Sequence, residues 1–492
     1  MDIIRVEGTG MKLEPLGKAY KYYQTNDIVN RYSKITDLLH PNKENFIQPS
    51  SVLSVMMKNY IVGDNTMVDG IRKEPWMHCF DYLKQDFIPC ELPSHGKLDK
   101  SQSQIACNLK NLLLEEVLSF VDGKNTVGIL LSGGMDSRVV AGLLRELQES
   151  GAFSGDVVCL TWGVESTRDV VYARRIAKQF SWESLHFPLS AESLIENIHL
   201  AADMGAEFSP LHLHAMNSVA KTKGIDGIIA ASYGDSVGRA EYSGTKVKDL
   251  SGLLSNDFDK FGLISSSVRK QFGVEVQIEL QKYHKLFPRQ QDWQHFEIER
   301  QCHYMRRQLG ACMSIIDNSV PLYQIFTKPS VFNYMWSLDP KCRTDYVYVE
   351  LLKILPGDLL NIPWARDGKI YPGVGNALDN IPSAYNKYGI WLRNECSDIV
   401  NTALNSGVLE SLNLFNPYSI NSLKSYWYKS KSESADRLDE RVSWMVSLSI
   451  FADKYNIKAE KENNDLGWVD CINSLKGRSY SSVYRFGRSV IK

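Results

Sequence analysis

One short segment, residues 130–139, constrains the fold of this 492-residue chain more than any other. An apolar run at residues 127–131 leads into a turn with two glycines, and a stretch with helical spacing of apolar residues follows. A strand, a glycine turn and a helix N-terminus together form an anion site, because glycines let the backbone close on a phosphate and unpaired N–H groups point toward it. The sequence therefore predicts a phosphate-binding loop, formed by Leu131, Ser132, Gly133, Gly134, Asp136 and Ser137.

The side chains of this loop suit a magnesium-bound polyphosphate. Ser132 and Ser137 can add hydroxyl donors, and Asp136 is well placed to hold Mg²⁺ on the phosphates. The loop lacks the Gly-Lys-Ser/Thr ending of a Walker A motif, and it is not the Gly-x-Gly-x-x-Gly dinucleotide fingerprint. The pattern Ser-Gly-Gly-x-Asp-Ser resembles the pyrophosphate-binding loop of the ATP pyrophosphatases, which cleave ATP to AMP and pyrophosphate. The alternative is a chance glycine turn between a strand and a helix.

Length and composition bound the class of protein. A chain of 492 residues can bury a large core and should hold two or three domains. Its 43% hydrophobic and 23% charged residues are typical of an ordinary soluble protein. A net charge of −1 gives no general attraction to nucleic acid or to an acidic membrane, so we expect no nucleic-acid partner.

The cysteines and the apolar runs indicate a cytoplasmic protein. The nine cysteines are scattered and form no Cys-x-x-Cys pair, so neither a zinc site nor a disulfide framework is predicted. The first residues do not read as a signal peptide, and no apolar run approaches membrane-spanning length. We therefore expect no transmembrane segment.

Strand-like and helix-like stretches alternate through the middle of the chain. Strands separated by crossover helices predict an α/β fold with a doubly wound parallel sheet, whose ligands bind at the carboxyl ends of the strands. A strand-turn-strand unit is expected at residues 60–71, a linker at 93–104 and mainly helical structure from about residue 249. The expected strands are 127–131, 157–161, 184–187 and 225–231, and the expected helices are 105–120, 137–148, 169–180, 191–202 and 212–223.

A second polar loop, residues 232–236, follows the last of these strands and should emerge at the same edge of the sheet as the first. Together the motifs are similar to the synthetase domain of the asparagine synthetases, which β-lactam synthetases and lasso-peptide cyclases share. An upstream segment, residues 63–71, is similar to a Gly-Asp-Arg-Thr-Leu-Phe-x-Gly-Ile segment late in that family's glutaminase domain. The resemblance covers roughly residues 50–380. It is carried by Ser132–Ser137, Thr161-Trp162-Gly163, Asp169-x-x-Tyr172-Ala173 and Tyr233-Gly234-Asp235.

The resemblance implies three parts of the chain. Residues 105–380 would form an ATP pyrophosphatase domain of the adenine-nucleotide α-hydrolase-like kind, followed by a helical extension at 381–492. Residues 1–100 would be a shortened, β-rich remnant of a glutaminase domain. That remnant would be inactive, because the family's glutaminases need a cysteine directly after the initiator methionine and the first cysteine here is Cys79.

The resemblance also implies ATP and Mg²⁺ as cofactors. Asp136 and Asp235 would share the metal and act in catalysis, although a plain turn residue is an equal alternative for Asp235. The polyphosphate would lie on the first loop and the adenine near residues 161–163. The expected nucleotide-binding residues are Leu131, Ser132, Gly133, Gly134, Asp136, Ser137, Thr161, Gly163 and Gly234.

The second loop departs from the family pattern. Asparagine synthetases carry Ser-Gly-Glu-Gly-x-Asp-Glu there, whereas this chain has Ser236 in place of the last glutamate and Tyr233 where a small residue is usual. A tyrosine near this position helps to deprotonate the nucleophile in β-lactam synthetases, which makes Tyr233 a catalytic candidate. Related enzymes also place a lysine late in the domain, for which Lys369 and Arg366 are the candidates here. Ordinary surface charges are the alternative for both.

The leading hypothesis is an AMP-forming amide ligase that adenylates a substrate carboxylate and transfers ammonia or an amine to it. The substrate would be a small-molecule, sugar or peptide carboxylate, as in bacterial pathways for surface polysaccharides or modified peptides, and a separate glutaminase could supply ammonia. The alternatives are asparagine synthesis from ammonia and a non-catalytic ATP-binding scaffold. The basic, aromatic C-terminal segment around Arg478, Arg485, Arg488 and Lys492 could touch an anionic partner or membrane surface, or it could be a solvated terminus.

Overall fold

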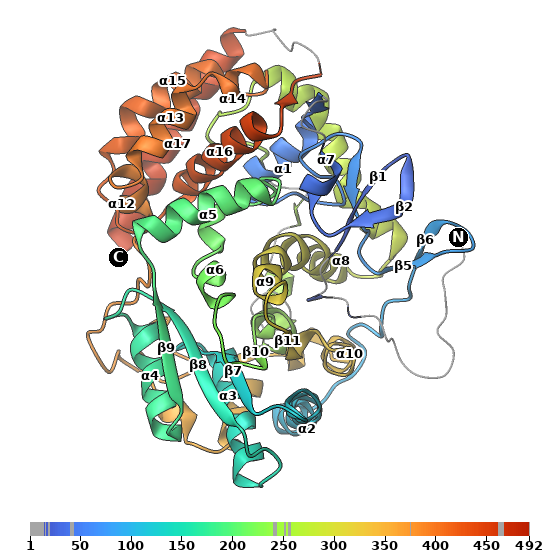
Figure 1. The fold of residues 1–492 in the computed structure, drawn as a ribbon, viewed down its shortest axis with the longest axis vertical. Helices are drawn as coiled ribbons and strands as arrows, with labels where there is room; N and C mark the ends of the chain where they lie inside the picture. The colour runs from blue at the N-terminus through green and yellow to red at the C-terminus, as the bar shows by residue number, and fades with distance from the viewer. Residues whose placement is uncertain are drawn as a thin grey trace.

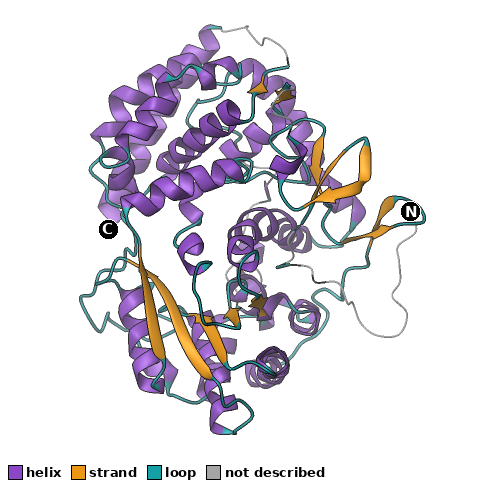
Figure 2. Ribbon diagram, viewed as in Figure 1, coloured by secondary structure: helices purple, strands orange, loops and turns teal. Residues whose placement is uncertain are grey.

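The computed structural model describes residues 14, 16–17, 20–39, 44–239, 244–249, 252–253, 257–373, 375–460 and 467–491. Helices form most of this part of the chain, and the strands gather in a few small sheets (Figure 2). The strands are β1 (Tyr22–Gln24), β2 (Asp27–Tyr32), β3 (Asn45–Phe46), β4 (Ile71–Lys73), β5 (His78–Asp81), β6 (Asp86–Pro89), β7 (Thr126–Leu130), β8 (Asp156–Gly163), β9 (Glu183–Pro188), β10 (Gly227–Ala230), β11 (Leu322–Gln324) and β12 (Ile457–Lys458).

The helices follow the order of the chain from blue to red in Figure 1. They are α1 (Pro49–Lys58), α2 (Gln102–Val121), α3 (Met135–Glu149), α4 (Arg168–Phe180), α5 (Ala191–Asp203), α6 (Met216–Val219), α7 (Ser266–Leu286), α8 (Asp292–Glu299), α9 (Gly310–Asp317), α10 (Pro329–Ser337), α11 (Asp345–Lys353), α12 (Tyr388–Arg393), α13 (Ser397–Asn405), α14 (Val408–Ser411), α15 (Pro417–Tyr426), α16 (Arg437–Lys454) and α17 (Trp468–Ile491).

A five-stranded parallel sheet forms the centre of the part of the chain that runs from β7 to β11. Its strand order is β11-β10-β7-β8-β9, so the chain runs outward from β7 to β9 and then returns to build β10 and β11 on the other side. The order of the strands therefore reverses between β7 and β10. Ligands bind at such a switch point in doubly wound sheets, because the loops after the two strands diverge and leave a crevice there.

Helices cover both faces of this sheet. Along β7 and β8 successive side chains alternate: Val127 and Ile129 belong to the core beneath α2, α3 and α4, whereas Leu130, Val158 and Leu160 join the core beneath α6 and α9. This alternation is the period of two that a strand imposes on its side chains. The doubly wound α/β fold predicted from the sequence is confirmed.

Most of the predicted elements of the sheet are present, but two expectations were wrong. Residues 212–223 hold only the end of the 3₁₀ turn Pro210–His212 and the short helix α6, because His214 adopts a left-handed conformation (φ 45°) that a helix cannot continue. Residues 60–70 contain only isolated bridges before β4. The linker expected at 93–104 is irregular as far as residue 101, where α2 follows, and its amides at Gly96, Lys97 and Leu98 donate to carbonyls at the end of α10.

The N-terminal and C-terminal segments share one hydrophobic core. Its members run from Tyr22 and α1 through α5 and α7 to α16. Strand β12 pairs in parallel with β3, and Arg441 on α16 donates to the carbonyl of Met56 on α1 at 2.8 Å. The division of the chain near residues 100 and 380 stays a prediction, but the segments on either side of it are packed together. Within the described ranges, none of the helices has the length and apolar character that crossing a bilayer requires.

Candidate active site at the edge of the parallel sheet

The loop between β7 and α3 has the form of an anion cradle. Gly134 is the residue before α3, and no side chain caps the helix, so the first backbone amides of α3 are left for a ligand. The two serines fold the turn itself: Ser132 Oγ accepts from the Gly134 amide at 3.1 Å, and Ser137 Oγ accepts from the Ser132 amide at 3.2 Å. These contacts present the helix N-terminus to the crevice, which fits a polyphosphate.

Asp136 joins this loop to the loop after β10. A Cβ on Gly234 would lie 2.5 Å from Asp136 Oδ1, so only glycine allows this close approach. Arg239, just beyond the second loop, holds the Asp136 carboxylate through two contacts of 3.0 Å, from Nε and Nη2. The structure therefore brings Asp136 and the Gly234-Asp235 pair to one place, as the sequence motifs predict.

A cavity of about 450 Å³ opens at this junction. Three carboxylates reach it, from Asp136, Asp169 and Asp235, and carboxylate oxygens are the ligands that Mg²⁺ prefers. Burial raises the pKa of Asp169 to about 6, although the Gly133 amide donates to it. Within the described residues, no group of three or more His, Cys, Asp or Glu side chains could hold a metal ion by itself. Asp136 and Asp235 fit a magnesium ion that takes its other ligands from a polyphosphate and water. The remaining lining residues are Leu130, Leu131, Ser132, Gly134, Ser137, Thr161, Trp162, His212, His214, Met216, Ala231, Ser232, Tyr304, Gln308, Leu309, Cys312, Met313 and Tyr385.

The far wall of the cavity is aromatic. Trp162 follows Thr161 at the end of β8, and the rings of His214 and Tyr385 lie opposite. His214 Nδ1 lies 3.1 Å from the hydroxyl of Tyr388, and burial lowers the pKa of His214 to about 3. This histidine is therefore neutral, and the wall suits a flat, uncharged group such as a nucleotide base.

Several predicted site residues lie outside the cavity lining. Gly133 turns its carbonyl to Arg138 and to the Ala365 amide, so it supports the loop from behind. Gly163 and Gly234 also stand behind the wall, at backbone positions next to lining residues. The nucleotide-binding roles of these three glycines stay predictions. The other predicted nucleotide-binding residues line the cavity: Leu131, Ser132, Gly134, Asp136, Ser137 and Thr161.

Of the predicted catalytic side chains, Asp136 and Asp235 line the cavity, whereas Tyr233 and Lys369 do not. Tyr233 is buried in the core beneath α3 and does not line the cavity. Lys369 is half-buried and Arg366 is exposed, and the lining includes neither of them. Their loop nevertheless contacts the phosphate loop through Ala365. The catalytic roles of Tyr233 and Lys369 stay predictions, and the geometry favours Asp136 and Asp235.

Two arginines at the site were missed in the sequence. Arg239 stands 103 residues from Asp136 and belongs to no motif that we recognised. Arg138, directly after the phosphate loop, is fully buried and donates to four carbonyls, those of Gly133, Leu359, Ile362 and Pro363. Its position in the sequence gave no signal, because helical spacing places Arg138 opposite the apolar side chains of Val140, Leu144 and Leu147, and only the fold buries both faces.

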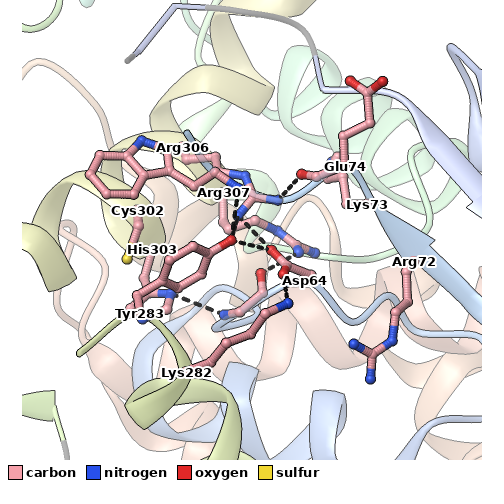
Figure 3. Close-up of polar contacts among 12 residues, drawn as sticks. Asp64, Arg72, Lys73, Glu74, Lys282, Tyr283, Cys302, His303, Arg306 and Arg307 are labelled. Carbon is pink, nitrogen blue, oxygen red and sulfur yellow. Dashed lines mark hydrogen bonds and ion pairs between the residues drawn. The ribbon is translucent and has the colours of Figure 1, made fainter. Parts of the chain in front are cut away.

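The segment similar to the end of a glutaminase domain is anchored against the helix behind the cavity. The buried Asp64 carboxylate contacts Arg306 at 2.8 Å and Tyr283 at 2.7 Å, and it also pairs with Lys282 (Figure 3). The Gly63 amide donates to Nδ1 of His303 at 3.0 Å. Arg306 and His303 lie on the π-helical segment Arg300–Leu309, whose Tyr304, Gln308 and Leu309 line the cavity.

Comparison with known proteins agrees with these motifs. The family model described as asparagine synthase matches residues 108–224, which include the phosphate loop, β8 and α4. A search of curated proteins found no match.

Two solved structures have limited similarity to the chain. One is the U34-tRNA thiolase NcsA from Methanococcus maripaludis with its [4Fe-4S] cluster, at 16% identity and a TM-score of 0.22, covering 37% of this chain and 65% of that one. The other is NMN synthetase from Francisella tularensis, at 14% identity and a TM-score of 0.20, covering 45% of this chain and 95% of that one. Residues 108–224 of this chain match the asparagine synthase family model. This match indicates an ATP-using carbon–nitrogen ligase domain.

Proposed function

We propose that the chain is an AMP-forming amide ligase that activates a carboxylate with ATP and joins it to ammonia or an amine. In this reaction a carboxylate oxygen attacks the α-phosphorus, pyrophosphate leaves, and the nitrogen then displaces AMP from the acyl carbon. The observation that carries the proposal is the meeting of Asp136 with Gly234-Asp235 at the switch point of the sheet, beside an uncapped helix N-terminus.

The residues of the chain have distinct tasks in this proposal. The amides at the start of α3 hold the β- and γ-phosphates, and the aromatic wall at Trp162 and Tyr385 receives the adenine. Asp136 and Asp235 would hold Mg²⁺, which neutralises charge on the polyphosphate. No protein side chain forms a covalent bond in this reaction. The protein therefore contributes by orienting the reacting groups and by stabilising the charge that develops on the pyrophosphate.

The cavity favours a substrate other than free aspartate. Free aspartate carries a second carboxylate, which a binding site normally pairs with a cation. Among the described lining residues there is no lysine or arginine, whereas three carboxylates are present. A sugar or peptide carboxylate, with hydroxyl or amide groups around the reacting acid, agrees better with the serine, glutamine and aromatic side chains at the cavity.

A product screen tests the proposal. The purified chain is incubated with Mg²⁺, ATP and ammonium, together with aspartate, uronic acids or peptides with a free carboxyl group, and amides are detected by mass spectrometry. We expect an amide that requires ATP from a uronic acid or a peptide. Asparagine as the preferred product would instead identify an ammonia-dependent asparagine synthetase. ATP turnover without an amide from any acid would contradict the ligase assignment.

A further inference from the structure

Helix α17 exposes its apolar side chains to solvent. Trp468, Leu475, Val483 and Phe486 are 76%, 60%, 71% and 71% exposed, and Ile472 lies between them on the surface. Successive members of this group are four, three, eight and three residues apart, which places all five on one face of a helix with 3.6 residues per turn. We call this group the apolar stripe of α17. The exposed Ser479 separates Leu475 from Val483, but an exposed apolar group of this size on one face still marks an interaction surface.

The face that attaches α17 to the protein is polar. Both carboxylate oxygens of Asp470 accept from Ser266, at 2.7 Å from its amide and 3.0 Å from its hydroxyl. Further along, Arg485 Nε donates to Asp436 at 2.6 Å. An ordinary surface helix packs its apolar face inward, so α17 has the reverse arrangement. The other inward residues are the small Ser474, Gly477 and Ser481 and the partly buried Tyr480, whose ring packs against Phe261.

The charges beside the stripe are positive. Lys476 and Arg478 are exposed on the two flanks of the stripe. The acidic residue of α17 is Asp470, which is buried and turned inward. The chain as a whole has a net charge of −1, so this basic, apolar surface is a local feature. Helix α17 packs against α15 within the orange and red helical layer (Figure 1).

We propose that α17 binds the surface of an anionic lipid bilayer. The helix would lie in the plane of the interface, with Trp468, Leu475 and Phe486 among the acyl chains and Lys476 and Arg478 at the headgroups. Helices that bind at a membrane interface have aromatic and leucine side chains on one face and lysine or arginine beside that face. A second copy of the chain fits less well, because the bases of two such helices would meet across the contact.

Vesicle co-sedimentation of the full-length chain tests this proposal. Vesicles of phosphatidylcholine are compared with vesicles of phosphatidylcholine mixed with phosphatidylglycerol. We expect binding to the mixed vesicles, weakened by salt. The double variant K476Q/R478Q should lower the partition coefficient about 25-fold, since each base contributes about fivefold. The double variant L475E/F486E should lower it at least about tenfold.

A matched control uses a second pair of exposed apolar residues. Val274 and Ile278 lie on α7 and are also exposed, so V274E/I278E makes the same change of charge away from α17 and should bind vesicles as the unmodified chain does. If L475E/F486E does not fold, L475S/F486S takes its place in the vesicle-binding test. Absence of binding to the mixed vesicles, or equal binding by L475E/F486E and V274E/I278E, would overturn the proposal. A dimer in light scattering that L475S/F486S abolishes, without vesicle binding, would assign the stripe to a second copy.

Discussion

At the scale of single residues, Asp136 has the central position. Its carboxylate faces both loops, and its amide belongs to the helix N-terminus to which we assign the phosphates. We predict that D136N lowers ATP–pyrophosphate exchange at least about 100-fold, because the metal loses a charged ligand where the pyrophosphate charge develops. The control is D156N, which removes an exposed carboxylate at the opposite end of the neighbouring strand. Equal exchange rates for the two variants would exclude Asp136 from the chemistry.

Arg239 orients that carboxylate. Its guanidinium holds both oxygens of Asp136 and also lies 3.7 Å from Asp345. We predict that R239Q lowers the exchange rate about 10- to 100-fold, the range found when the partner that orients a metal ligand is removed. R366Q changes an exposed arginine of the late loop and should leave the rate within about twofold. The opposite ranking would move the catalytic cation to the loop that contains Lys369.

At the scale of elements, Arg138 connects α3 to the loop at residues 359–365. Three of its four carbonyl partners are buried with it, the carbonyl of Ile362 is partly buried, and each buried group left unpaired costs about 1–3 kcal/mol. We therefore predict that R138M lowers the free energy of unfolding by roughly 3 kcal/mol or more, measured by urea denaturation.

R145M is the matched control for this prediction. Arg145 lies on the same helix, is partly exposed and forms an ion pair with Glu149 one turn later. R145M should lower the free energy of unfolding by less than about 0.5 kcal/mol. A comparable loss of stability in both variants would show that the carbonyl contacts of Arg138 contribute little.

The elements of the central sheet could be predicted because their patterns are local. The apolar run before Ser132 and the helical spacing after it gave β7 and α3 with their bounds correct to two residues, and the resemblance located the second loop. The prediction of a helix at 212–223 was wrong, because tertiary contacts hold His214 in a left-handed conformation. The pairing of Arg239 with Asp136 could not be predicted, since the sheet alone brings these two distant residues together.

At the scale of the whole molecule, buried histidines couple stability to pH. Burial lowers the pKa of both His303 and His214 to about 3, from an unfolded value near 6.5. The unfolded chain therefore binds more protons below about pH 6.5, so their stabilisation is complete above that pH and is lost as the pH falls toward 3.

This linkage gives a measurable slope. Two such groups lower the free energy of unfolding by about 2.7 kcal/mol per pH unit between about pH 6 and 5. The variant H303N keeps an acceptor for the Gly63 amide but does not titrate, so it should reduce the slope by about 1.4 kcal/mol per pH unit. Urea denaturation across this pH range measures both slopes, and an unchanged slope in H303N would show that His303 is protonated in the folded chain.

The whole account depends on where ATP is cleaved. In the proposed reaction, the uncapped start of α3 and the carboxylates of Asp136 and Asp235 would hold a metal-bound polyphosphate that leaves as one unit. Phosphorus NMR of the nucleotide products, with the carboxylate that gives an amide, measures this directly. We predict AMP and pyrophosphate in equal amounts, both lost in D136N. Formation of ADP and phosphate would contradict the account.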